Sequence, residues 1–80
     1  MTKIPLAIEF LEATSAALVS SRELFKITWL EEEQTFFIHV NSREQAAILI
    51  GSQGTTVGAL RKLVSIMTKT SFINIRIQKD

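Results

Sequence analysis

The residues whose types and spacing could do chemistry lie in one stretch, positions 51–58 (GSQGTTVG), which holds all three glycines of the chain. Gly51 and Gly54 allow the backbone to turn sharply at positive φ, and neither has a side chain that would obstruct a ligand. A helical pattern begins at Thr55 or Thr56, so the unpaired N–H groups at the start of that helix point back into the turn. A turn of this kind can bind an anion such as a phosphate.

Two interpretations of the glycine spacing are open. In the structural interpretation, Gly51 terminates one helix and Gly54 precedes the next, with no ligand involved. In the functional interpretation, the turn clamps a ligand. The stretch lacks the glycine spacing and the lysine of a P-loop, and it does not match the GxGxxG fingerprint of dinucleotide-binding folds. The spacing therefore argues against nucleoside triphosphate chemistry.

The composition is that of one small domain spanning residues 1–80. The chain is 46% hydrophobic, which is enough for a single core. It has no cysteine, which excludes disulfides, thiolate nucleophiles and zinc–thiolate sites. The apolar segment 4–11 is interrupted by Glu9 and is too short for a signal sequence or a membrane-spanning helix. We therefore expect a cytoplasmic protein.

The side chains that commonly support catalysis form no recognisable pattern here. The sequence offers no nucleophile–base pair, no carboxylate dyad and no cluster of metal ligands, so we expect neither an enzyme nor a cofactor. The single histidine, His39, has no second histidine or cysteine nearby with which to bind a metal.

The small net charge of +1 conceals an uneven distribution. Residues 1–41 contain three basic and six acidic residues, a net charge of −3, whereas residues 42–80 contain six basic and two acidic residues, a net charge of +4. The glycine stretch lies in the basic half. This distribution is compatible with a polyanionic partner, and ordinary solvated surface charge is the alternative.

Hydrophobic periodicity predicts the order helix, strand, strand, helix, helix, strand. Pro5 suits the first turn of a helix, and Ser42 with Gln45 forms a capping box. The expected elements are a helix over 5–20, a hairpin of strands 24–30 and 35–40, a helix over 42–51, a helix from 55 or 56 through 67, and a strand over 72–78. A helical crossover favours parallel pairing of the second and third strands. The fold class is therefore α+β, with a three-stranded mixed sheet and the helices on one face.

Alternation along the strands separates inward from outward side chains. The inward set is apolar in all three strands: Phe25, Ile27, Trp29, Phe36, Ile38, Val40, Ile73, Ile75 and Ile77. Phe37 and His39 then lie on the bare outer face. We expect them to mark a surface for a homodimer or another protein partner, with an isolated exposed aromatic as the alternative.

The helices have less definite faces. The first helix contains two helical repeats, Leu6-Phe10-Ala13-Ala17 and Leu11-Ser15-Leu18, and either can supply its buried face. The third helix is expected to expose Arg61 and Lys62. Its expected apolar face consists of Val57, Leu60, Leu63, Val64 and Met67, widened by Ala59 and Ile66.

The order of elements and the glycine stretch together resemble the type II K-homology (KH) domain, whose core is strand, helix, GxxG, helix, strand. The resemblance covers essentially the whole chain. Its most specific part is similar to the IGxxG turn and Thr-x-x-Ala-Leu helix of small bacterial KH proteins of the KhpA type and of the KH domain of Jag. The matching residues here are Ile50-Gly51-Ser52-Gln53-Gly54 followed by Thr56, Ala59, Leu60, Arg61 and Val64.

The resemblance implies single-stranded RNA binding without catalysis, in the role of an RNA chaperone or a post-transcriptional regulator. In KH domains the GxxG turn clamps the backbone of about four nucleotides, and the bases lie in an apolar groove beside it. Carried onto this chain, the resemblance implies that the clamp is Gly51, Ser52, Gln53 and Gly54, followed by the helix start at Thr55 and Thr56. The groove is then lined by Ala47, Ile50 and Val57. The cations at its margins are Arg43, Arg61 and Lys62.

The chain departs from the family pattern in its clamp. Both middle positions, Ser52 and Gln53, are uncharged, whereas relatives often have a lysine or arginine there, and Gly58 replaces a larger residue within the helix. RNA affinity is therefore expected to be low and sensitive to salt. The alternative function is a KH-fold protein–protein interaction module that has lost RNA binding.

Overall fold

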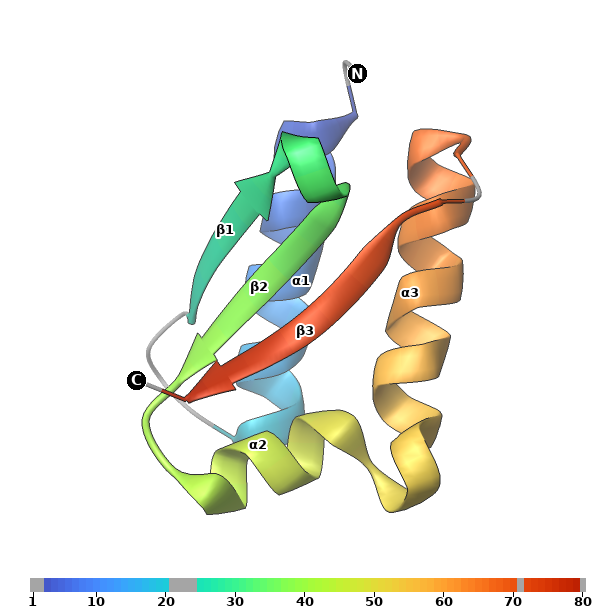
Figure 1. The fold of residues 1–80 in the computed structure, drawn as a ribbon. Helices are drawn as coiled ribbons and strands as arrows, with labels where there is room; N and C mark the ends of the chain where they lie inside the picture. The colour runs from blue at the N-terminus through green and yellow to red at the C-terminus, as the bar shows by residue number, and fades with distance from the viewer. Residues whose placement is uncertain (1–2, 21–24, 71, 80) are drawn as a thin grey trace.

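The computed structural model describes residues 3–20, 25–70 and 72–79 (Figure 1). The elements follow the predicted order, with a short 3₁₀ turn after the first strand and another before the third helix. They are α1 (Ile4–Val19), β1 (Lys26–Leu30), η1 (Glu31–Glu33), β2 (Thr35–Val40), α2 (Arg43–Ile50), η2 (Ser52–Gly54), α3 (Thr55–Thr68) and β3 (Asn74–Lys79). The predicted start of the first strand at residue 24 lies outside the described residues.

The sheet has three strands in the order β1-β2-β3, so β2 is central. β1 pairs with β2 antiparallel, and β3 pairs with β2 parallel. The predicted α+β fold with a mixed sheet is therefore confirmed. In Figure 1, α1 passes behind the sheet, α3 stands along its β3 side, and α2 crosses near the ends of β2 and β3. None of these helices covers the face turned toward the viewer.

The core lies between the sheet and the helices. Six of the nine predicted inward side chains are buried, and Ile27, Trp29 and Ile77 are half-buried against the core. The Trp29 and Phe36 rings pack with their centroids 4.4 Å apart and a 43° angle between their planes. The strand pattern thus predicted the inward face of the sheet correctly. A shift of one residue would have placed the apolar side chains on the opposite face.

The buried face of α1 follows the second of the two predicted repeats, with one correction. Leu11 and Ser15 are buried, together with Ala7 and Ala16, but Leu18 is 43% exposed. The buried stripe advances four residues at a time and continues at the half-buried Val19, which moves Leu18 to the side of the helix. Three members of the first repeat, Leu6, Ala13 and Ala17, are exposed.

The buried face of α3 is narrower than predicted. Leu60 and Val64 are buried, while Val57 and Met67 are half-buried. Three residues predicted to be buried are exposed instead: Ala59, Leu63 (47%) and Ile66 (64%). Contacts with β3, α2 and α1 cover one side of α3, and these three residues share an adjoining flank that no described element covers.

Ser15 presents a buried polar atom to the core. Its hydroxyl is fully buried and has no hydrogen-bond partner among the described residues. Such a group is left without the hydrogen bond that it makes to water in the unfolded chain. We expect Ser15→Ala to raise the free energy of unfolding by about 1 kcal/mol, measured by urea denaturation.

The control for this prediction is Ser65→Ala. Ser65 is half-buried within α3, so its substitution gives the gain in helix propensity without removing a buried hydroxyl. A gain at Ser15 no larger than the gain at Ser65 would show that the Ser15 hydroxyl is satisfied in solution.

Candidate nucleic-acid interface

The helix that leads into the glycine stretch starts at a capped end. The Ser42 Oγ accepts a hydrogen bond from the Gln45 N–H at 3.1 Å, as the predicted capping box requires. The Gln45 Oε1 accepts from the N–H of Asn41 at 2.8 Å, one residue earlier than that motif specifies. This cap fixes the start of α2. The helix has eight residues and ends at the glycine turn.

The glycine stretch forms a tight turn between two helices, as predicted. The Gly51 N–H donates to the Ala47 carbonyl at 2.9 Å and closes α2, and the Gly54 N–H donates to the Gly51 carbonyl at 3.2 Å. Gly51 has φ 78° and Gly54 has φ 77°, so both lie in the region that favours glycine. Between them, Gln53 also has a positive φ of 57°. The chain therefore reverses within η2, and α3 begins at Thr55.

The two glycines have different roles in this turn. A Cβ added to Gly51 would lie 2.8 Å from the Thr56 Cβ, so a glycine is required where the turn packs on the first turn of α3. A Cβ added to Gly54 would have no atom within 4 Å. Gly51 thus fits the structural interpretation, whereas Gly54 leaves open space, which is what the close approach of a ligand needs.

The polar groups around the turn face outward. Ser52, Gln53 and Thr55 are exposed, and Thr56 is half-buried. Gly54, the N-cap residue of α3, has no side chain to cap the helix. The Thr55 N–H donates to the Ser52 carbonyl within the turn, so the N–H groups offered to a ligand are those that follow it in the first turn of α3, together with the positive end of the helix dipole.

The predicted groove residues are placed near the turn. Ala47 and Ile50 are exposed on α2, on the side away from the buried Leu49, and Val57 is half-buried in the first turn of α3. Ala47 and Ile50 are therefore open to contact with a base, whereas Val57 also packs against the core.

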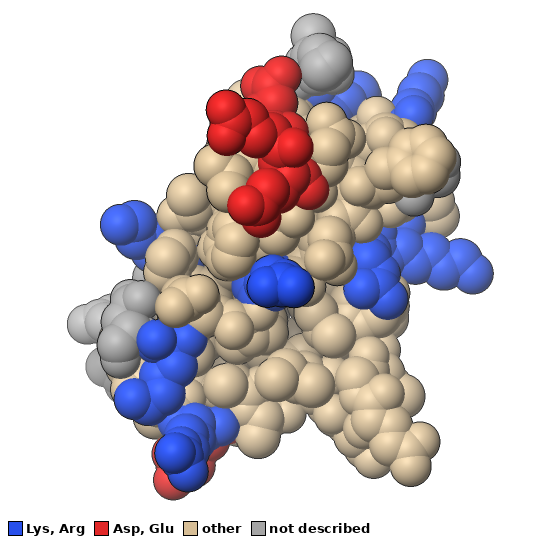
Figure 2. Space-filling model, in the orientation of Figure 1, with Lys and Arg blue, Asp and Glu red and all other residues tan. Residues whose placement is uncertain are grey.

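The predicted cations are less close to the turn. Arg43 is the first residue of α2, and that helix separates it from the turn by about 11 Å. Arg61 donates from Nη1 to the Asn74 Oδ1 at 3.2 Å and so reaches toward β3, while Lys62 is exposed. In Figure 2 the lower right of the molecule, where the turn lies, shows no basic side chain. The clamp must therefore rely on N–H groups and hydroxyls.

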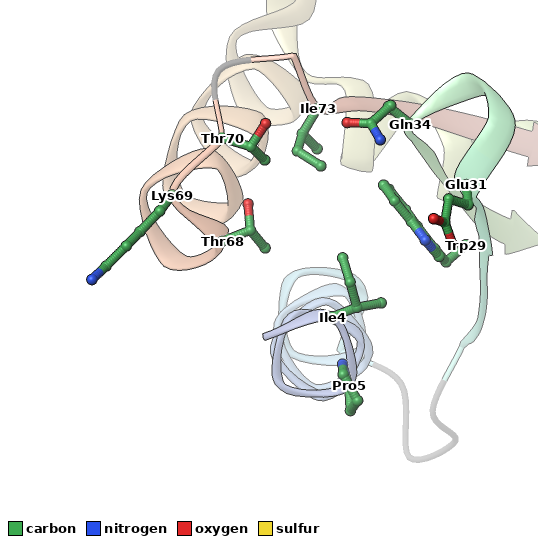
Figure 3. Close-up of a pocket in the computed structure, with 9 residues that line it drawn as sticks. All are labelled: Ile4, Pro5, Trp29, Glu31, Gln34, Thr68, Lys69, Thr70 and Ile73. Atoms are coloured by element: carbon green, nitrogen blue, oxygen red, sulfur yellow. The ribbon is translucent and has the colours of Figure 1, made fainter. Parts of the chain in front are cut away.

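A cleft that the sequence patterns did not indicate lies at the other end of α3. Its volume is about 640 Å³. Ile4, Trp29 and Ile73 point into the space between the start of α1 and the end of α3, and Lys69 points away (Figure 3). The lining residues are Ile4, Pro5, Trp29, Glu31, Gln34, Thr68, Lys69, Thr70 and Ile73. They come from three separate parts of the chain, 4–5, 29–34 and 68–73, and include none of the predicted site residues, so no local motif could have marked them.

The comparisons with known proteins assign no family. No family model matches the chain, and no curated protein matches it. None of the described helices combines the length and apolar content needed to cross a membrane. Within the same described residues, no group of three or more His, Asp or Glu side chains is arranged to hold a metal ion.

Proposed function

We propose that this chain is a type II KH domain that binds single-stranded RNA through the turn at residues 51–54, as an RNA chaperone or a post-transcriptional regulator and without catalysis. The observation that carries the proposal is the turn itself. It combines two glycines at positive φ, an open approach at Gly54 and an uncapped helix start. The helix–turn–helix between β2 and the parallel β3 supports the same fold family.

In this proposal the phosphate backbone lies against the turn. The open side of Gly54 allows a phosphate to approach the start of α3 and the positive end of its dipole, and the hydroxyls of Ser52 and Thr55 add donors. Bases then lie over Ala47, Ile50 and Val57. Because the turn itself has no cation, each phosphate contact is weak, and binding falls as salt rises.

The alternative function is a protein–protein interaction module on the same fold. It is favoured by one observation, the apolar flank of α3 formed by Ala59, Leu63 and Ile66, which remains exposed. Exposed apolar surface of this kind is common at protein interfaces. The two functions differ in whether the wild-type chain binds single-stranded RNA through the turn at residues 51–54.

The test is to replace Ser52 and Gln53 together with aspartate and to measure affinity for a random single-stranded RNA pool by fluorescence anisotropy at low salt. Two negative charges against phosphate are expected to weaken binding at least tenfold. Both side chains are exposed, and aspartate tolerates the positive φ at position 53, so the fold is retained.

The matched control replaces the same two residues with asparagine, which keeps the turn geometry without adding charge. Its affinity is expected to stay within about threefold of wild type. Equal binding by the aspartate variant and the wild type would remove the clamp assignment. A wild-type protein that binds no single-stranded RNA would favour the interaction module.

A further inference from the structure

The face of the sheet turned away from the helices is defined by the strand register. β2 places Phe37 opposite Thr28 on β1 and Arg76 on β3, and the next row is Lys26, His39 and Gln78. Alternation puts both rows on the same side of the sheet. A third row on this side, Leu30, Thr35 and Asn74, lies toward η1. The first two rows are called the outer sheet face below: Lys26, Thr28, Phe37, His39, Arg76 and Gln78. The four on the edge strands are exposed, and Phe37 and His39 are half-buried.

The charged side chains of the outer sheet face are all positive. It contains two cations, Lys26 and Arg76, and no acidic residue. The acidic side chains of η1, Glu31–Glu33, gather at one end of the molecule, and basic side chains occupy the middle and both margins of the same view (Figure 2). The outer sheet face therefore matches a negatively charged partner better than a neutral or basic one.

The outer sheet face also has an aromatic side chain, Phe37. Phe37 is on the middle strand, flanked in register by Thr28 and Arg76. The Thr28 Oγ1 and the His39 Nε2 lie 2.9 Å apart and form a hydrogen bond beside it. Proteins that bind single strands combine an aromatic side chain, on which a base stacks, with cations that track the backbone. The outer sheet face has both components.

Arg61 connects this face to the turn. It lies on α3, in the second turn after Thr55, and its guanidinium hydrogen-bonds Asn74 on β3, two residues before Arg76. Lys62 is exposed next to it. Figure 2 shows basic side chains on the α3 side and in the middle of the face. A strand leaving the glycine turn can thus meet cations along β3.

We propose that the outer sheet face is a second contact surface for single-stranded RNA, in which Phe37 stacks on a base and Arg76 and Lys26 contact phosphates. This proposal rests on the proposed function and extends it from the turn to a longer strand. Self-association through this face is the other interpretation of Phe37 and His39, and the experiment below distinguishes it from RNA binding.

The experiment compares two lengths of random single-stranded RNA, about four nucleotides to fill the turn alone and about twelve to reach the sheet. The variants are Phe37→Ser and Arg76→Gln. The control is Lys3→Gln, which removes the same charge at the exposed start of α1. Phe37→Ser is expected to weaken binding of the long RNA about fivefold or more, by loss of stacking. Arg76→Gln is expected to reduce the slope of log K against log salt by about 0.7. Both should leave binding of the short RNA within about twofold.

The outcomes separate this proposal from the clamp. If Arg76→Gln and Lys3→Gln have equal effects on the long RNA, and Phe37→Ser is folded with unchanged affinity, the sheet contact is wrong and the clamp stands. If the wild type binds the two lengths equally, the sheet contact is also wrong. If neither length binds, both proposals fail. If sedimentation shows a wild-type dimer that Phe37→Ser converts to monomer, the face is a protein interface instead.

Discussion

Replacing Gly51 with alanine is expected to lower the free energy of unfolding by about 3 kcal/mol or more, the largest loss among the three glycines. The conformation at φ 78° and ψ 174° is one that only glycine readily adopts, and forcing another residue into it costs about 1–3 kcal/mol. The added Cβ would also lie 2.8 Å from the Thr56 Cβ, and overlap of this kind costs about 1–3 kcal/mol. Urea denaturation followed by circular dichroism measures the sum.

The other two glycines are its controls. Gly54→Ala meets no atom within 4 Å, so only the left-handed backbone costs energy, about 1–2 kcal/mol. Gly58→Ala lies within α3 with open space around it and is expected to stabilise by up to about 1 kcal/mol. Adding Thr56→Ala to Gly51→Ala removes the overlap with the Thr56 Oγ1 but leaves the overlap with the Thr56 Cβ and N, so it should recover only part of the loss. Equal losses at Gly51 and Gly54 would show that the Thr56 contact has no energetic role.

Replacing Phe36 with alanine is expected to cost about 3–5 kcal/mol, because the ring is fully buried on the central strand. A domain of this length has a total stability of about 4–12 kcal/mol, so the substitution is expected to remove a large part of it. Trp29, the single tryptophan, packs on the ring at 4.4 Å and reports the loss through its fluorescence.

Substitutions of two other phenylalanines are the controls for Phe36→Ala. Phe72 is 80% exposed, so Phe72→Ala is expected to change the free energy of unfolding by less than about 0.5 kcal/mol. Phe37→Ala removes a half-buried ring and should fall between the two. Comparable losses at positions 36 and 37 would contradict the assignment of the inward and outward faces.

The sequence predicted the sheet more accurately than the helices, for a physical reason. In strands, side chains alternate strictly, so the apolar Phe36, Ile38 and Val40 leave a single choice of buried face. In helices, an apolar stripe can be shifted by a residue without losing its periodicity. The width of the buried stripe depends on how many neighbours pack against the helix, and the exposure of Leu63 and Ile66 on α3 follows from neighbours on one side only.

In the candidate site too, the sequence predicted one part and missed another. The glycine turn was predictable, because its conformation depends on local residues and on the steric freedom of Gly51 and Gly54. Distances between elements were not predictable from local pattern. The sequence grouped Arg43 with the turn, but α2 holds it at the far end, and the cleft beside Trp29 is assembled by tertiary packing alone.

The central position of β2 sets an order of events as the chain folds. Its antiparallel partner β1 is only a short turn away, and hairpins of this kind form in about 1–10 μs. Its parallel partner is distant, since Thr35 pairs with Asn74, 39 positions later. Until β3 has been synthesised and has docked, the second edge of β2 has unpaired backbone groups that can pair with another chain. Docking of β3 on β2 therefore ends the interval in which this edge is open to pairing with another chain.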